Sequence, residues 1–198
     1  METPLQIIRL LADGRCHSGE AIAGHLGVSR AAVWKALRKA GEALGLEIVA
    51  ERGRGYRLPA PLELLDAARI LAVLSPEAQK RIGRMEIHDA IDSTNTRLMR
   101  EAAEGAPNGT LCLAERQTAG RGRLGRIWVS PFGANLYLSL LWRFPFGPGG
   151  MGGLSLAAGA GVADALRAAG ARDIGLKCGL DARLQSAGAK QPETGQHQ

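Results

Sequence analysis

Residues 115–142 read ERQTAGRGRLGRIWVSPFGANLYLSLLW, a glycine- and arginine-rich segment followed by an apolar one. The glycines allow backbone angles that other residues avoid and let the main chain close tightly on a ligand. The arginines between them add planar cationic groups suited to phosphate or carboxylate. These residues are Gly120, Arg121, Gly122, Arg123, Gly125 and Arg126. The first part of the stretch therefore predicts a loop that binds an anion.

The glycine spacing in this loop also satisfies the dinucleotide-binding fingerprint. That fingerprint requires a strand before the glycines and a helix directly after them. Residues 110–114 supply a strand, but the residues at 127–129 favour another strand and Pro131 favours a turn. No helix N-terminus is then predicted for a pyrophosphate. A dinucleotide site is the weaker interpretation, and a solvated connection or a phosphate-backbone contact is the plain alternative.

Length and composition predict an ordinary folded protein. A chain of 198 residues that is 45% hydrophobic can form one core, or a small domain and a medium one. The net charge of +6 is compatible with nucleic acid without requiring it. Cys16, Cys112 and Cys178 are widely spaced, which excludes a disulfide framework or a zinc knot, and no metal-ligand set is predicted. Without a signal segment or a membrane-length apolar run, we expect a soluble cytoplasmic protein with no membrane partner.

The first 60 residues contain a helix-turn-helix pattern. A helix is expected up to residue 11, a second at 18–26, and a third from Ser29 to about residue 40. Short strands at 47–49 and 55–58 would then form a hairpin wing. Residues 1–60 are thus predicted to be a winged helix-turn-helix domain.

The third predicted helix has one apolar and one basic face. Val33, Leu37 and Ala40 share a stripe that faces the core, and no acidic residue interrupts the basic face opposite. Because the helix and the wing tip carry the same charge, both would meet phosphates, and DNA binding is favoured over a winged helix used for protein contacts. The predicted DNA-binding residues are Ser29, Arg30, Lys35, Arg38, Lys39, Arg52 and Arg54.

Strands and helices mix in the rest of the chain. The proline-rich residues 59–61 mark a boundary, and 61–83 are expected to be a linker with a connecting helix at 63–74. Helices are expected from Ser93 or Thr94 to residue 103 and at 154–169. Strands are expected at 85–88, 110–115, 127–130, 135–142 and 174–177. The predicted fold class is α+β, with a mixed α/β domain at 84–177.

Three ordered motifs resemble the biotin protein ligase family. They are IDSTN at 91–95, QTAGRGRLGR at 117–126 with its continuation WVSPFGANLY at 128–137, and Lys177. The resemblance implies a class II synthetase-like catalytic domain. Such a domain forms biotinyl-5′-AMP from biotin and ATP with Mg²⁺, and transfers biotin to a lysine of a biotin carboxyl carrier protein. The winged helix implies a bifunctional member that represses biotin genes on operator DNA, as a homodimer when it holds biotinyl-AMP.

The resemblance also implies site residues. Lys177 matches a catalytic lysine beside the ligand carboxylate and α-phosphate, and Arg121 and Arg123 match arginines of the loop that closes over the adenylate. The biotin and adenylate contacts it implies are Ser93, Thr94, Asn95, Gln117, Gly120, Arg121, Gly122, Arg123 and Lys177. For Ser93 and Thr94, a helix cap alone is the structural alternative.

The resemblance stops at Lys177. Family members continue with Trp-Pro-Asn-Asp, whereas this chain continues with Cys178-Gly-Leu-Asp181. Residues 178–198 show no helix or strand pattern, so we expect a divergent, disordered tail, produced by a frameshift or truncation that sequencing of the downstream DNA would reveal. The catalytic domain would then be incomplete at its C-terminus. Two alternatives to a bifunctional ligase and repressor follow, a catalytically inactive DNA-binding regulator and a lipoate ligase-like enzyme.

Overall fold

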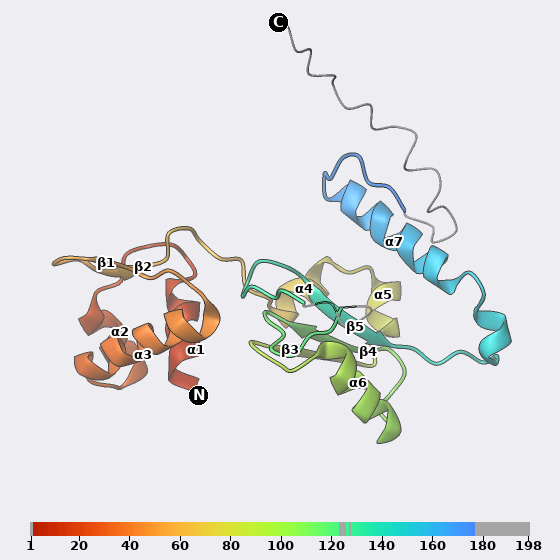
Figure 1. The fold of residues 1–198 in the computed structure, drawn as a ribbon, viewed down its shortest axis with the longest axis horizontal. Helices are drawn as coiled ribbons and strands as arrows, with labels where there is room; N and C mark the ends of the chain where they lie inside the picture. The colour runs from red at the N-terminus through yellow and green to blue at the C-terminus, as the bar shows by residue number, and fades with distance from the viewer. Residues whose placement is uncertain (1, 123–125, 127, 177–198) are drawn as a thin grey trace, which may run out of the picture. The chain divides into compact units, whose positions relative to one another are not determined.

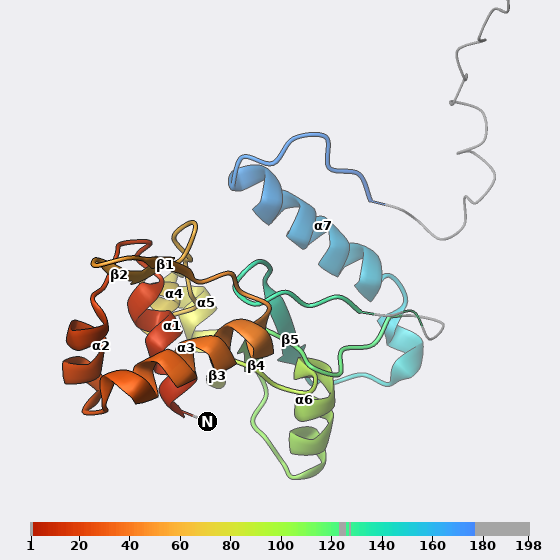
Figure 2. The same cartoon turned by 60° about the vertical axis from the view of Figure 1, so that its left-hand side comes forward.

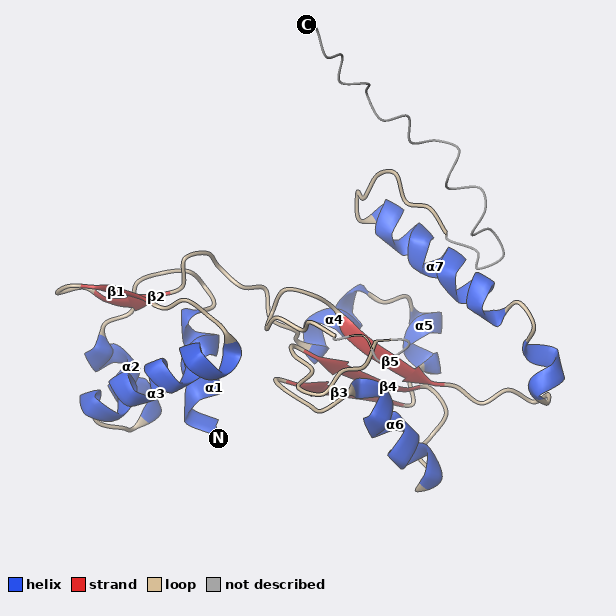
Figure 3. Cartoon of the chain, in the orientation of Figure 1, coloured by secondary structure: helices blue, strands red, loops and turns tan. Residues whose placement is uncertain are grey.

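The computed structural model describes residues 2–122, 126 and 128–176. It divides into two compact units, Met1–Arg143 and Phe144–Gln198 (Figure 1). The described chain alternates helices and strands as an α+β protein (Figure 3). None of the helices in the described ranges is long and apolar enough to cross a membrane.

The N-terminal sixty residues form a winged helix-turn-helix, as the sequence predicts. The elements are α1 (Glu2–Leu11), α2 (Gly19–Leu26), α3 (Arg30–Leu44), β1 (Val49–Glu51) and β2 (Gly55–Arg57). Ser18 and Ser29 cap α2 and α3, because each hydroxyl accepts a hydrogen bond from an N–H three residues later. The antiparallel strands β1 and β2 form the wing, which lies along one side of the helices (Figures 1 and 2).

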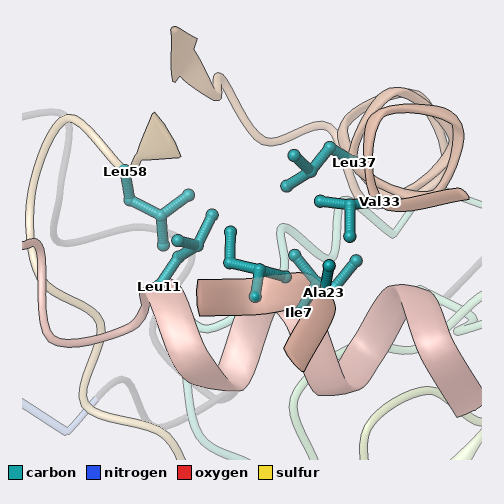
Figure 4. Packing of buried hydrophobic residues seen from close by; sticks show 7 residues of the cluster. Ile7, Leu11, Ala23, Val33, Leu37 and Leu58 are labelled. Atoms are coloured by element: carbon teal, nitrogen blue, oxygen red, sulfur yellow. The ribbon is translucent and has the colours of Figure 1, made fainter. Parts of the chain in front are cut away.

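The third helix extends one turn further than the sequence pattern suggests. Leu44 continues the buried stripe of Val33, Leu37 and Ala40, and Gly45 ends the helix in the left-handed conformation. Val33 and Leu37 of this stripe pack against α1, α2 and the residue after the wing (Figure 4). This core consists of Ile7, Leu11, Ile22, Ala23, Val33, Leu37 and Leu58.

Residues 84–141 build a three-stranded mixed sheet in the order β3 (Arg84–His88), β4 (Thr110–Ala114), β5 (Tyr137–Leu141). β3 and β4 are parallel and joined through α6 (Thr94–Ala103), whereas β4 and β5 are antiparallel. α6 packs against β4 and β5. The register of the sheet brings the loops that follow β3 and β4 to the same edge as the segment that precedes β5.

Four predicted elements differ from those observed. The first wing strand was expected at 47–49 and lies at Val49–Glu51. One connecting helix was expected at 63–74, but α4 (Ala67–Val73) and α5 (Pro76–Arg81) replace it, because Ser75 and Pro76 start a new helix. Residues 128–130 are irregular rather than a strand, and so are residues 174–176. In the second unit, a 3-10 turn (Pro148–Met151) precedes α7 (Leu154–Ala168), close to the helix expected at 154–169.

Candidate functional site

The two motifs at 91–95 and 117–126 lie side by side. Ile91 and Gln117 form a parallel bridge, and the N–H groups of Thr118 and Ala119 donate to the carbonyls of Ile91 and Asp92 at 2.8 and 2.9 Å. These bonds extend the pairing of β3 and β4 beyond the ends of both strands. The N-terminus of α6 is thereby held against the start of the glycine-rich loop.

Thr94 is the centre of a hydrogen-bond network at this junction. Its side chain is buried, and its N–H donates to the Oε1 atom of Gln117 at 2.9 Å. Its hydroxyl lies 3.3 Å from the same Oε1 and 2.8 Å from the hydroxyl of Ser139 on β5. Because a backbone N–H can only donate, the oxygen of the Gln117 amide faces Thr94 and its NH₂ group is turned the other way. The network therefore fixes which end of Gln117 can meet a ligand.

The other residues of the first motif have separate environments. Ser93 caps α6, since its hydroxyl accepts the N–H of Thr96 at 3.3 Å, and Asn95 is exposed on the first turn. The helix cap and a ligand contact are compatible for Ser93, because a hydroxyl has two acceptor lone pairs and one donor.

The glycines of the loop are required by close contacts. A Cβ on Gly120 would come within 2.5 Å of the Trp128 ring, and one on Gly122 within 2.7 Å of the Arg126 carbonyl oxygen. Neither glycine has a positive φ, so close approach rather than an unusual backbone angle explains them. Arg121 is exposed beside these contacts. Arg123 and Lys177 lie outside the described residues, as do Gly125 and the tail at 178–198.

A buried carboxyl group precedes the loop. Glu115 is 2% exposed and accepts the N–H of Leu65 at 2.5 Å. Burial raises the pKa of Glu115 above its ordinary value of 4.5, because removal from water disfavours the charged form, while the Leu65 N–H lowers the pKa in part. Glu115 thus ties the segment after the wing to the base of the loop.

The raised pKa of Glu115 predicts a stability gain on removal of its charge. Some carboxyl groups have a higher pKa in the folded than in the unfolded state. Such a group destabilises the fold as the pH rises above its pKa in the unfolded state. Glu115→Gln keeps an acceptor for Leu65 and loses the charge. We expect this variant to be more stable than the wild type in urea at pH 7, with a difference that shrinks as the pH falls toward 4.5. Glu63→Gln, at an exposed carboxyl group, is the control. A less stable Glu115→Gln variant at pH 7 would contradict this prediction.

α3, the second helix of the helix-turn-helix and hereafter the recognition helix, contacts the segments on both sides of the glycine-rich loop. Before the loop, the Arg116 guanidinium donates to the carbonyl of Ala43 near the end of α3. After the loop, Phe132 is buried among Ile8, Ala40 and Leu44. The segments on both sides of the loop are therefore in direct contact with α3.

The predicted DNA-binding residues divide between two sides of α3. Arg30 lines a hollow of about 660 Å³ that it shares with Arg52 and Arg54 of the wing. Lys39 instead lines a separate hollow of about 510 Å³ together with His88 and Arg116. Ser29 uses its hydroxyl as the helix cap. Of these candidates, the structure brings Arg30 together with the wing and leaves Lys39 apart from it.

Acidic residues accompany the basic ones on this surface, contrary to the expectation from the shorter helix. Because α3 continues to Leu44, Glu42 follows Arg38 one turn later, with 3.8 Å between the Arg38 Nε and its Oε1. In the wing, Glu51 lies 3.0 Å from Arg54. The pair of Arg38 and Glu42 is exposed and therefore weak, so Arg38 can exchange Glu42 for phosphate. Glu51 is only 23% exposed and also lies 2.6 Å from Arg57.

Sequence reasoning missed two residues of these surfaces. Trp34 is 54% exposed on α3, and the cationic group of Arg38 lies 5.1 Å from its ring centroid. Its spacing of four residues from both Arg30 and Arg38 was a signal that could have placed it on their face. Ser139 joins the Thr94 network from a strand 45 residues away, and nothing in the local sequence marks it.

Comparison with known proteins agrees with both halves of this architecture. Residues 4–57 match the family model of an HTH domain, and residues 87–174 match the biotin/lipoate A/B protein ligase family. Residues 87–174, which carry the site motifs, belong to the biotin/lipoate A/B protein ligase family. The winged helix, the α+β fold and the family resemblance expected from the sequence are thereby confirmed.

Individual relatives share this arrangement over most of the chain. The bifunctional ligase/repressor BirA of Salmonella typhimurium is 45% identical over 174 residues, which are 88% of this chain and 52% of that protein. The bifunctional ligase/repressor BirA of Escherichia coli is 44% identical over 182 residues, 92% of this chain and 54% of that protein. A biotin--[acetyl-CoA-carboxylase] ligase of Mycobacterium tuberculosis is 46% identical over 76 residues, 37% of this chain and 29% of that protein. The chain spans about half the length of the BirA relatives.

Proposed function

We propose that this chain carries the DNA-binding domain and the biotin-recognition part of a bifunctional biotin protein ligase. The ligase would form biotinyl-5′-AMP from biotin and ATP and transfer biotin to a lysine of a biotin carboxyl carrier protein. The DNA-binding domain would repress biotin genes by binding operator DNA. The main support is the contact between residues 91–95 and 117–119, in which Thr94 orients the Gln117 amide, within a chain that also has a winged helix.

The ligand would be held from both sides of this contact. We propose that Ser93, Asn95 and the outward NH₂ group of Gln117 contact biotin, with Gly120 and Gly122 allowing the main chain to approach it. Activation brings two anions together, the biotin carboxylate and the α-phosphate of ATP, so fixed positive charge lowers the barrier. We assign that charge to Arg121, Arg123 and Lys177. By covering the adenylate, the two arginines would also keep water from it.

Magnesium is proposed as the metal of the adenylation step. Among the described residues, no group of three or more His, Cys, Asp or Glu side chains could hold a metal ion. Mg²⁺ commonly binds through substrate phosphates and a few carboxylates, and it would neutralise phosphate charge in this site. We therefore propose that the ion enters with ATP.

Transfer of labelled biotin tests the ligase part of the proposal. The chain is incubated with labelled biotin, ATP, Mg²⁺ and a biotin carboxyl carrier domain, and label on the carrier lysine is measured. Label on the carrier supports the ligase, whereas DNA binding without transfer supports the second candidate, a DNA-binding regulator that has lost ligase activity. Parallel incubation with labelled lipoate distinguishes a lipoate ligase-like enzyme.

Thr94→Val tests the network that orients Gln117. The change keeps the volume and removes the hydroxyl, which leaves Ser139 without this partner and loosens the Gln117 amide. We expect biotin to bind about 10-fold more weakly in calorimetry, since loss of one buried hydrogen-bonding partner costs about 1–3 kcal/mol. Thr96→Val, two residues further along α6, is the matched control. Equal biotin affinities for the two variants would exclude the network from ligand binding.

Lys35→Ala tests the DNA-binding part of the proposal. Each lost phosphate contact reduces the slope of log K against log salt by about one. We expect that reduction for Lys35→Ala in a titration with duplex DNA, and no reduction for Lys80→Ala, at an exposed position of α5. An unchanged slope for Lys35→Ala would indicate a surface that contacts protein rather than DNA.

Two further features of the proposal concern assembly and location. The contacts of Phe132 and Arg116 connect the ligand loop to α3, which supports control of DNA binding by biotinyl-AMP.

We propose that the ligand-bound form acts on DNA as a homodimer, since two winged helices cover two half-sites. We also propose a cytoplasmic location, in keeping with the free thiols of Cys16 and Cys112.

A further inference from the structure

We propose that Trp34 reads thymine by contacting its 5-methyl group in the major groove, and so helps to select the DNA sequence. This inference rests on the proposed DNA-binding function and assigns a base-reading residue to it. Trp34 is the fifth residue of α3, the second helix of the helix-turn-helix. In this motif the N-terminal residues of the second helix contact base edges in the major groove.

The exposure of Trp34 is the first observation. More than half of the Trp34 residue, 54%, is accessible to water, although its neighbours Val33 and Leu37 on α3 are buried. Tryptophan is enriched at interfaces, where a partner buries its large apolar ring. The neighbouring core positions Val33 and Leu37 are fully covered, so Trp34 is not needed to complete the core.

The surface beside Trp34 is apolar and concave. A hollow of about 330 Å³ runs between α3 and the wing, and Trp34 and Arg38 form part of its wall. Its apolar lining is Trp34, Leu37, Leu46, Ile48, Ala50 and Tyr56. A small apolar group of a ligand would therefore be removed from water on several sides at once.

The charge around this hollow indicates what carries that apolar group. The charged residues of its lining are Arg38 and Glu42. The hollow of about 660 Å³, which shares Ala50 and Tyr56 with this one, is lined by Arg30, one turn before Trp34, and by Arg52 and Arg54 of the wing. A partner that uses these arginines together with Trp34 is a polyanion that also presents a small apolar group. In the major groove of duplex DNA, that group is the thymine methyl. An apolar protein surface would satisfy Trp34 but would make no use of the arginines beside it.

The pair of Trp34 and Arg38 is already arranged for such a contact. The guanidinium carbon of Arg38 lies 5.1 Å from the indole centroid, within the range of a cation–π interaction. The stacking limits the rotamers of both side chains before DNA arrives, so less conformational entropy is lost on binding. The indole meets the base edge, and the guanidinium next to it is free to meet a phosphate.

A comparison of thymine with deoxyuridine in the same duplex tests the inference, because the two bases differ only by the 5-methyl group. A duplex is selected from a random pool by the wild-type chain and resynthesised with deoxyuridine in place of every thymidine. Affinities of the wild type, Trp34→Ala and Lys35→Ala for both duplexes are measured by fluorescence anisotropy at several salt concentrations. Circular dichroism verifies that each variant is folded.

For the wild type, we expect the deoxyuridine duplex to bind about fourfold more weakly for each methyl group contacted. This factor is the free energy of burying one methylene, converted to a ratio of affinities. Trp34→Ala should bind both duplexes equally, with the affinity that the wild type has for the deoxyuridine duplex. Lys35→Ala should bind both more weakly, with a reduced salt slope, and should keep the full ratio between the two duplexes. That pattern separates a base contact from a phosphate contact.

Other outcomes overturn the inference and distinguish it from the proposed function. Equal wild-type affinities for the two duplexes, with a steep salt slope, would leave DNA binding intact and exclude thymine reading. A Trp34→Ala variant that keeps the full thymine preference would assign that preference to another residue. If no duplex is selected, both the DNA-binding function and the inference fail, and Trp34 would then belong to a protein-binding surface.

Discussion

Replacement of Gly55 by alanine is expected to disrupt the wing. Gly55 begins β2 with φ of +136°, a conformation that side-chain-bearing residues rarely adopt. A Cβ there would lie 2.0 Å from the carbonyl oxygen of His17. That carbonyl accepts the N–H of Tyr56 at 2.8 Å, and the Tyr56 carbonyl accepts the N–H of His17 at 2.9 Å. The clash therefore falls on the bonds that attach the wing to the segment before α2.

We expect Gly55→Ala to lower the free energy of unfolding of the winged helix by about 2–6 kcal/mol, the sum of backbone strain and overpacking. Urea unfolding followed by circular dichroism measures the loss. Gly53→Ala is a matched control in the same hairpin, since Gly53 also has a positive φ of +76° but has nothing within 4 Å of an added Cβ. The control should lose only about 1–2 kcal/mol, the cost of a left-handed alanine. Equal losses would mean that the contact with His17 does not constrain the wing.

Replacement of Phe132 by alanine is expected to destabilise the junction between the ligand loop and the recognition helix. Phe132 is 3% exposed and packs among Ile8, Ala40 and Leu44 of α1 and α3. Removal of a buried phenyl ring costs about 3–5 kcal/mol, because it leaves a cavity as well as losing apolar burial. We expect a loss of this size in urea unfolding of the chain.

The control for Phe132 is Phe146→Ala, at a ring that is 49% exposed. Its loss should be well below that of Phe132→Ala, since exposed substitutions usually change stability by less than about 0.5 kcal/mol. A biotin titration of the Phe132→Ala variant adds a functional readout, because Phe132 follows directly after the loop. Equal stability of the two variants would show that Phe132 does not bridge the two parts in solution.

The amino-acid sequence by itself determined the elements that depend on near neighbours. Ser18, Ser29 and Ser93 were recognisable as helix caps because a cap bonds to an N–H only three residues away. The core stripe of α3 followed from helical periodicity, and the same rule would have placed Trp34 between Arg30 and Arg38. The family resemblance was also readable, because its motifs are short and continuous.

Only the tertiary structure decided which distant segments meet. The strand expected at 127–130 does not form over residues 128–130, where Ser130 instead accepts the N–H of Gln117 at 2.7 Å and Trp128 packs over Gly120. A β-propensity gives a strand only when a partner strand packs beside it, and residues 128–130 pair with no strand of the described chain. The link between Thr94 and Ser139 likewise depends on how α6 packs on β5. Local sequence carries no signal for such pairings, since they join side chains that only the folded sheet brings within hydrogen-bonding distance.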